Sequence, residues 1–328
     1  MGTSAQPLRL NKKVVVTTIS IVTLVILAYS LITGGYQAFL EINAVSLVLA
    51  IAVYMISWLI TALRLMFLHK KLGDNKIMPI HHYFYARLLG GLMAYLTPSA
   101  IGGEPARAYY LYKKLGGSYP KYLALVVYEV FYDVVVVCTI ATGFALYALP
   151  LTIPVIIVGV GNLGIWIMLY GLFNNIVNPR QANPLISKIL LFIEEKIVRR
   201  KTLLENGYST FGLYFRKITR SMGLSSKLVV VLLTILSNIT ASLTIFIIGL
   251  THVKTDPLVL FINSIVAFYY SSSLGAIPSP GGAMVIEYGL SITLDPAVVV
   301  ISRTIMYYTV IISGFLILVR TGLSDRSK

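Results

Sequence analysis

The chain has 328 residues, 57% of them hydrophobic and 12% charged, and its formal net charge at pH 7 is +15. Several apolar runs reach the roughly 20 residues that a helix needs to cross about 30 Å of hydrocarbon. These values exclude an ordinary soluble protein and indicate an all-α integral membrane protein. In a soluble chain the charge would suggest nucleic-acid binding, but here the basic residues cluster between apolar runs, as in loops that face anionic lipid.

Six apolar runs are long enough for full membrane crossings. In chain order they cover residues 14–33, 45–68, 122–148, 154–173, 228–250 and 297–319. The first run follows a basic segment, but it is too long for the core of a signal peptide and lacks a small-residue cleavage pattern. We therefore predict that it is retained as the first transmembrane helix.

Two more apolar segments, residues 83–112 and 258–294, are interrupted near the middle by prolines and glycines. Proline lacks an N–H and glycine costs backbone entropy, so such a corner persists at bilayer depth only where it is buried in protein or lines a watery cavity. We predict that each segment is a re-entrant hairpin of two short helices. The predicted tip residues are Thr97, Pro98, Gly102 and Gly103 in the first corner, and Pro278, Pro280, Gly281 and Gly282 in the second.

Loop charges orient the predicted crossings. Basic residues gather within residues 9–13, 70–76, 113–121, 180–227 and 320–328, and all of these segments fall on one side of the membrane. The opposite loops carry Glu41, Asp256 and Asp295, with Lys254 as their clear basic exception. Because short cytoplasmic loops carry an excess of Lys and Arg, we predict a multi-pass cell-membrane protein with both termini in the cytoplasm.

In this orientation the two hairpins enter from opposite sides of the membrane. Residues 14–148 and 154–319 then form an inverted-topology repeat within a single membrane domain, residues 8–320. Secondary transporters use such repeats to give alternating access to a site at the midplane. Two alternatives stay open: the corners are ordinary loops outside the membrane, or the chain crosses the membrane eight times.

The longest polar segment, residues 174–227, is predicted to be a cytoplasmic loop. Apolar residues at helical spacing and many basic residues favour an amphipathic helix on an anionic lipid surface. A solvated connector is the alternative. The apolar positions are Leu185, Ile189, Phe192, Ile193 and Ile197.

Ionisable residues inside the apolar segments gather around the two corners. Each costs about 2.5–3.5 kcal/mol on insertion scales, so each needs a partner or a polar cavity. Glu129 and Asp133 are four residues apart and so share one helix face. The planar guanidinium of an arginine can bind a phosphate through two hydrogen bonds. We predict a site for an anionic lipid headgroup. Its predicted residues are Arg107, Arg303, Glu104, Glu287, Glu129 and Asp133.

A purely structural role is the alternative for these residues. Arg107 with Glu104, and Arg303 with Glu287, would then be internal ion pairs that hold the hairpins in place. Arg87 lies on the first arm of the first hairpin, and Arg64, near the end of the second crossing, is predicted to extend towards the cytoplasmic headgroups. The four histidines have no metal-ligand spacing, so we predict no metal and no cofactor.

At these residues the chain resembles the transmembrane region of lysylphosphatidylglycerol synthase, also described as the flippase-like domain family. The resemblance covers roughly residues 8–320. It rests on Thr97-Pro98, Gly102-Gly103-Glu104, Arg107, Glu129, Asp133, Pro278, Pro280-Gly281-Gly282, Glu287, Arg303 and Tyr307. There are two departures. Val130 stands where family members often carry arginine, which removes a possible partner for Glu129, and Met284 replaces an expected glycine, which suggests a tighter or apolar wall at the second hairpin.

The resemblance implies a flippase or scramblase that moves a phospholipid or a polyprenyl-phosphate-linked lipid between leaflets, with Tyr307 joining the headgroup site. The soluble synthase domain of two-part members is not in this chain. Two alternatives stay open. One is an integral membrane transferase acting on a lipid-linked sugar or aminoacyl lipid, with Glu129 or Asp133 as general base. The other is a non-catalytic partner of a separate synthase. A homo-oligomer also stays open, and no nucleic-acid partner is expected.

Overall fold

The computed structural model describes residues 12–37, 42–74, 76–97, 102–175 and 201–322, and within these ranges the secondary structure is helical throughout. The first half contains α1 (Lys12–Thr33), η1 (Gly35–Gln37), α3 (Ala44–Lys71), α4 (Ile80–Leu96), α5 (Gly103–Leu115), α6 (Tyr119–Ala145) and α7 (Ile153–Asn175). The second half contains α9 (Lys201–Ser221), α10 (Leu224–His252), α11 (Pro257–Leu274), η3 (Pro280–Gly282), α12 (Val285–Ser291) and α13 (Pro296–Thr321). The all-α prediction is therefore confirmed for the described residues.

Seven helices in the described residues are long and apolar enough to cross a membrane. Six of them, α1, α3, α6, α7, α10 and α13, match the six predicted crossings. The seventh, α11, is the first arm of the predicted second hairpin. Its 18 residues span about 27 Å, slightly less than the hydrocarbon thickness. The chain is thus a multi-pass membrane protein, and the number of crossings and the re-entrant hairpins stay predictions.

Acidic residues begin two of these helices. The side chain of Asp256 accepts hydrogen bonds from the backbone N–H groups of Leu258 and Val259 at the start of α11, and Asp295 does the same for Ala297 at the start of α13. Each acid is followed by proline, which suits the first helical turn. Such caps contribute about 1 kcal/mol each. The two acids that helped to orient the loops are therefore also helix caps.

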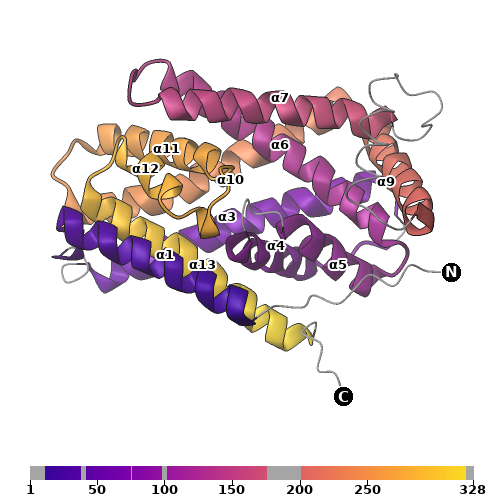
Figure 1. Ribbon diagram of the computed structural model, residues 1–328, viewed down its shortest axis with the longest axis horizontal. Coiled ribbons are helices and arrows are strands. Elements are labelled where there is room, and N and C mark those ends of the chain that lie inside the picture. The colour runs from indigo at the N-terminus through magenta and orange to yellow at the C-terminus, as the bar shows by residue number, and fades with distance from the viewer. Residues whose placement is uncertain (1–11, 38–41, 75, 98–101, 176–200, 323–328) are drawn as a thin grey trace.

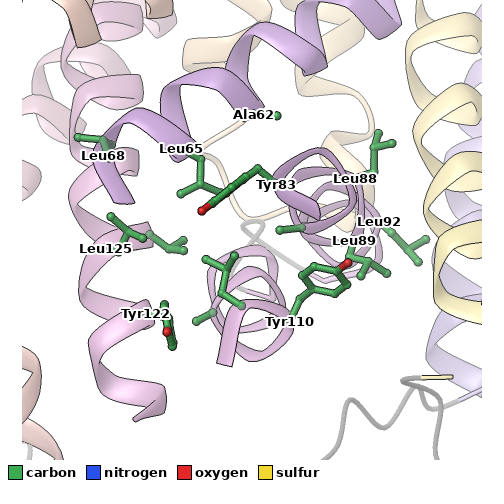
Figure 2. Packing of buried hydrophobic residues seen from close by; sticks show 14 of the residues in the cluster. Ala62, Leu65, Leu68, Tyr83, Leu88, Leu89, Leu92, Tyr110, Tyr122 and Leu125 are labelled. Carbon is green, nitrogen blue, oxygen red and sulfur yellow. The ribbon is translucent and has the colours of Figure 1, made fainter. Parts of the chain in front are cut away.

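The core forms where α4 and α5 pack against α3, α6 and α13. Figure 2 shows Leu65 of α3 close to Tyr83 of α4, with Leu88 and Leu92 on the opposite side of α4, and all four are buried. Lipid chains are as apolar as these side chains, so close packing rather than exclusion from water stabilises the contact. In Figure 1, α1 and α13 lie side by side and antiparallel along one flank.

The second corner contacts α4, the helix that leads into the first corner. In the first corner, Thr97 accepts a hydrogen bond from the backbone N–H of Gly102 at 2.9 Å, whereas Pro98 lies outside the described residues. In the second, η3 packs against α1 and α4. Gly281 has φ 57°, and a Cβ there would lie 2.6 Å from Val22 and 3.2 Å from the carbonyl oxygen of Tyr95. Only glycine fits so close an approach.

The loop that precedes α10 is described in part. The predicted amphipathic helix around residues 185–197 lies outside the described residues. The next helix, α9, packs against α6 and α7 and buries Phe211, Phe215 and Ile218. Part of the segment assigned to a cytoplasmic loop thus belongs to the packed helical body.

Candidate functional site

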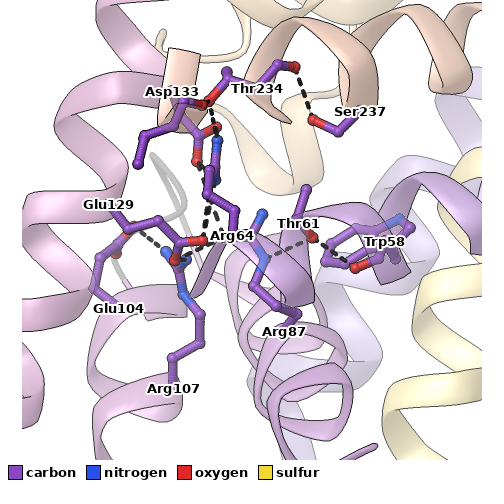
Figure 3. A network of polar contacts seen from close by, with 11 residues as sticks. Trp58, Thr61, Arg64, Arg87, Glu104, Arg107, Glu129, Asp133, Thr234 and Ser237 are labelled. Atoms are coloured by element: carbon purple, nitrogen blue, oxygen red, sulfur yellow. Dashed lines mark hydrogen bonds and ion pairs between the residues drawn. The ribbon is translucent and has the colours of Figure 1, made fainter. Parts of the chain in front are cut away.

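Arg64 of α3 lies at the centre of a buried ionic network (Figure 3). Its Nη1 and Nη2 donate to the two carboxylate oxygens of Asp133 at 2.6 and 2.7 Å. Nη2 and Nε also donate to Oε1 of Glu129 at 3.1 and 3.3 Å, and Nη1 donates to the hydroxyl of Thr234. The Arg64 side chain has no exposed surface. The prediction that Arg64 extends to the headgroups is therefore wrong, because its charge is held by α6.

Glu129 joins this arginine to two others. Its second oxygen, Oε2, accepts from Nη1 of Arg107 at 2.8 Å and from Nη1 of Arg87 at 3.2 Å. Arg107 also donates from Nη2 to Oε1 of Glu104 at 3.3 Å. Three arginines thus face three carboxylates, so the formal charge of the described network is zero. Such balance is what a buried ionic cluster requires.

Helix spacing and one glycine assemble the network. Glu129 and Asp133 share a face of α6, as predicted, and both contact Arg64. Glu104 and Arg107 are three residues apart on α5. A Cβ on Gly90 of α4 would lie 2.5 Å from Cγ of Arg107, so glycine is needed there for α4 and α5 to approach closely.

A cavity of about 560 Å³ lies beside the network. Its charged lining residues are Arg87, Glu104 and Asp133. Aliphatic side chains form part of the remaining wall. Four aromatic side chains and several small polar ones also line it: Tyr54, Trp58, Trp166, Phe268, Ser57, Thr61, Asn162, Ser237, Asn238 and Ser272. The volume is typical of small-molecule sites, which combine an apolar wall with a few polar groups.

Arg87 has the guanidinium group that a ligand in the cavity can reach. Its Nε donates to Thr61 and its Nη1 to Glu129, but its Nη2 donates to none of the described residues. Its charge also lies over the ring of Trp58, 5.7 Å from the centroid. Arg64 has no exposed surface, whereas the Arg87 side chain is 11% exposed. A ligand in the cavity would therefore meet Arg87 first.

A second cluster surrounds Arg303 on α13. Arg303 donates from Nε to Oε1 of Glu287 at 2.8 Å and from Nη2 to the carbonyl oxygen of Gly281 at 2.5 Å. Its guanidinium lies over the rings of Tyr95 and Tyr307. Arg303 and Glu287 are 2% and 3% exposed and do not line the cavity. This cluster joins the second corner to α13.

The predicted headgroup residues thus fall into two groups. Glu104, Arg107, Glu129 and Asp133 come together in the network, whereas Glu287, Arg303 and Tyr307 form the second cluster. Both ion pairs named as the structural alternative are present. The roles of Arg64 and Arg87 in the network were not predicted from the sequence. A charge count would have found them, because Arg107 alone cannot neutralise three carboxylates.

The two departures from the family pattern have clear structural settings. Val130 lines the cavity, and Glu129 has three arginine partners without an arginine at that position. Met284 has φ 69°, the conformation that glycine would adopt at no steric cost. Its side chain is 71% exposed, so it does not tighten the packing at the second hairpin, and the apolar wall stays a prediction.

A smaller polar cluster lies where α3 ends and α6 begins. Asp74 accepts hydrogen bonds from Lys121 and from Nε2 of His69, whose Nδ1 contacts the hydroxyl of Tyr83 at 2.6 Å. Burial acts to raise the pKa of the Asp74 carboxyl, but the hydrogen bonds from Lys121 and His69 outweigh it and hold this pKa below its ordinary value. Across the described residues, no group of three His, Cys, Asp or Glu side chains is placed to hold a metal ion.

Comparison with known proteins places the chain in one family. No curated protein matches the sequence. A family model, described as the lysylphosphatidylglycerol synthase TM region, matches residues 13–323. This match covers nearly the whole length, including both corners, the network and the Arg303 cluster. The chain therefore belongs to the family of the lysylphosphatidylglycerol synthase transmembrane region.

Proposed function

We propose that this protein moves an anionic lipid, either a phospholipid or a polyprenyl-phosphate-linked lipid, between the two leaflets. One observation carries the proposal: a cavity among apolar helices is lined by Arg87, whose Nη2 donates a hydrogen bond to none of the described residues. An unpaired guanidinium donor inside a membrane protein is costly unless a ligand or water uses it. A phosphate oxygen is a favourable acceptor for such a donor.

The lining of the cavity suits a headgroup in transit. Trp58, Trp166 and Phe268 offer broad apolar surfaces, and Asn162, Ser237 and Asn238 offer uncharged polar groups. The amide nitrogen of Asn238 is buried and has no partner in the described structure. A headgroup can thus gain hydrogen bonds in the cavity while the acyl or prenyl tails stay in lipid.

The contact between the second corner and α4, the first arm of the first hairpin, supports alternating access. Because η3 packs against α4, a movement of the second hairpin would displace the first arm of the first hairpin. A ligand shifts such an equilibrium only if it binds one arrangement better than the other. The Arg303 cluster then acts as the joint that holds the second corner on α13, rather than as a second phosphate site.

Charge at the helix ends supports cytoplasmic termini. α3, α5, α9 and α13 have basic residues in their last turns, and α5, α9 and the end of α13 lie towards the right of Figure 1. The acidic caps Asp256 and Asp295 begin α11 and α13, whose starts lie towards the left. Under the positive-inside rule the basic end faces the cytoplasm.

The transferase alternative needs a general base that opens to the cavity. Glu129 has no exposed surface, and both oxygens of Asp133 are held by Arg64. Asp133 lines the cavity and is 30% exposed, but its ion pair with Arg64 favours the ionised carboxylate and makes it a weak base. The geometry therefore favours translocation without covalent change.

Reconstitution into vesicles tests the proposal. Fluorescent phosphatidylglycerol and a fluorescent polyprenyl phosphate would each be followed between leaflets of phosphatidylcholine vesicles by their access to an external quencher. The wild type should move at least one of them faster than protein-free vesicles. Arg87→Gln should abolish the movement, whereas Arg320→Gln, at the end of α13 and outside the cavity, should not. Equal rates for the wild type and Arg87→Gln would remove Arg87 from the mechanism.

A further inference from the structure

We infer that the site takes up one proton together with each lipid phosphate, and that Glu104 is the carboxylate that receives it. The inference rests on the proposed function and deepens it, because it names what balances the charge of the lipid. It starts from the charge count of the network and from the unequal way in which its three carboxylates are held.

The network without ligand is already neutral. Arg64, Arg87 and Arg107 face Glu104, Glu129 and Asp133, and every one of these residues contacts another in the network. A phosphodiester brings one more negative charge into the same apolar surroundings. An uncompensated charge in such a place is strongly unfavourable. Uptake of one proton by a carboxylate restores the balance.

The other charged groups do not offer another route to neutrality. The walls that α7, α10 and α11 contribute to the cavity carry uncharged residues, among them Asn162, Ser237 and Ser272. Arg303 is paired with Glu287 outside the cavity. The charged groups around Glu104 are thus Arg107 on its own helix, Arg64 on α3, Arg87 on α4, and the two carboxylates of α6. Among the charged groups of the site, the three carboxylates are the ones that can take up a proton.

Of the three carboxylates, Glu104 gives up the weakest hydrogen bonding when it is protonated. Both oxygens of Glu129 accept from arginines, and its side chain has no exposed surface. Asp133 also lines the cavity and its side chain is 30% exposed, but both of its oxygens accept short hydrogen bonds from Arg64. Glu104 accepts one hydrogen bond in the described structure, the long one of 3.3 Å from Arg107, and its side chain is 25% exposed and lines the cavity.

Protonation of Glu104 also prepares the site for the phosphate. A neutral Glu104 no longer neutralises Arg107, so Nη2 of Arg107 becomes available to a phosphate oxygen. Glu104 lies in the first turn of α5, where the helix dipole favours a negative charge. The phosphate then takes over the position of the carboxylate. When the lipid leaves, the carboxyl group returns its proton to water and pairs with Arg107 again.

The test measures the pH dependence of lipid binding. Short-chain phosphatidylglycerol, whose phosphodiester stays ionised, is titrated into detergent-solubilised protein from about pH 5 to about pH 8. For wild type, the apparent dissociation constant should rise with pH, by up to about tenfold per pH unit for one linked proton. Glu104→Gln, which cannot ionise, should bind with a constant that stays flat across this range. Asp256→Asn, which keeps its helix cap, should retain the wild-type slope.

A direct proton measurement keeps the inference testable if Glu104→Gln fails to fold. Phosphatidylglycerol is added to wild-type protein in weakly buffered solution that contains a pH indicator, and alkalinisation close to one proton per bound lipid supports the inference. A flat wild-type profile without proton uptake overturns it. If lipid moves in vesicles without proton uptake, the proposed function stands and this inference falls. If proton uptake occurs on binding but no lipid moves, the inference stands and translocation falls.

Discussion

Arg303 donates to the backbone carbonyl oxygen of Gly281 at 2.5 Å, and so a single guanidinium holds the second corner against α13. The same guanidinium donates to Glu287 at 2.8 Å, which attaches α12 as well. Gly281 adopts φ 57° and approaches both Val22 and Tyr95. The planar fork of Arg303 thus adds to the packing of η3 against α1 and α4, and a lysine ammonium cannot reproduce its two directed hydrogen bonds.

Replacing Arg303 by glutamine should lower the free energy of unfolding by about 3–5 kcal/mol, because Glu287 is left charged and buried without its partner. Equilibrium unfolding in detergent measures this loss. The double variant Arg303→Gln/Glu287→Gln should regain much of the stability, since no buried charge is left unpaired. Purely additive losses in the two single variants and the double variant would contradict the pairing.

Replacing Arg64 by methionine should be at least as damaging, by about 3 kcal/mol or more, because Glu129 and Asp133 both lose a partner. Thermal unfolding in detergent gives the comparison. Arg320→Met is the matched control, because Arg320 lies in the exposed last turn of α13 and its loss should change stability little. A stable Arg64→Met variant would show that Arg87 and Arg107 suffice to neutralise α6.

The helices were predictable from the sequence because each depends on local composition. An apolar run of sufficient length predicted α1, α3, α6, α7, α10 and α13 without knowledge of their neighbours. The role of α11 was harder to predict, because the break that follows it at Gly275–Pro280 allows either a full membrane crossing or the arm of a hairpin. Only the packing of η3 against α1 and α4 indicates where that corner lies.

The site was predictable only in part, because its partners come from distant segments. Glu129 and Asp133 share a face through their spacing, and Glu104 and Arg107 are close in sequence. Arg64 joins α6 across 65 residues of chain, and no periodicity reports such a contact. Its position near the end of an apolar run suggested instead that it reaches the headgroups, a rule that holds only when no buried carboxylate lies within reach.

Replacing Met284 by glycine should stabilise the fold by about 1 kcal/mol. Met284 holds a positive φ of 69°, a conformation that costs a non-glycine residue about 1–3 kcal/mol. The greater freedom of glycine in the unfolded chain offsets roughly 0.5–1 kcal/mol of this gain. Unfolding in detergent measures the difference. Met284→Ala is the control: it removes an exposed side chain but keeps the strain, so its stability should match the wild type.

Asp74 should make the stability of its cluster with His69 and Lys121 depend on pH in the acidic range. Its pKa in the folded protein is held below the ordinary value by Lys121 and His69, although burial acts in the opposite direction. A group whose folded pKa is depressed stabilises the fold at pH values above its unfolded pKa, about 3.9 for aspartate. That contribution disappears as the pH falls from about 5 through the folded pKa.

Asp74→Asn should therefore be less stable than the wild type at neutral pH and equally stable in strong acid, because asparagine binds no proton in this range. Melting temperatures recorded in detergent from neutral to acidic pH should show the two curves converging below about pH 4. Asp295→Asn is the matched control, since asparagine keeps the helix cap on α13 and that carboxylate has no cationic partner among the described residues. Parallel curves for Asp74→Asn and the wild type at every pH would mean that the hydrogen bonds from Lys121 and His69 do not favour the ionised form of Asp74.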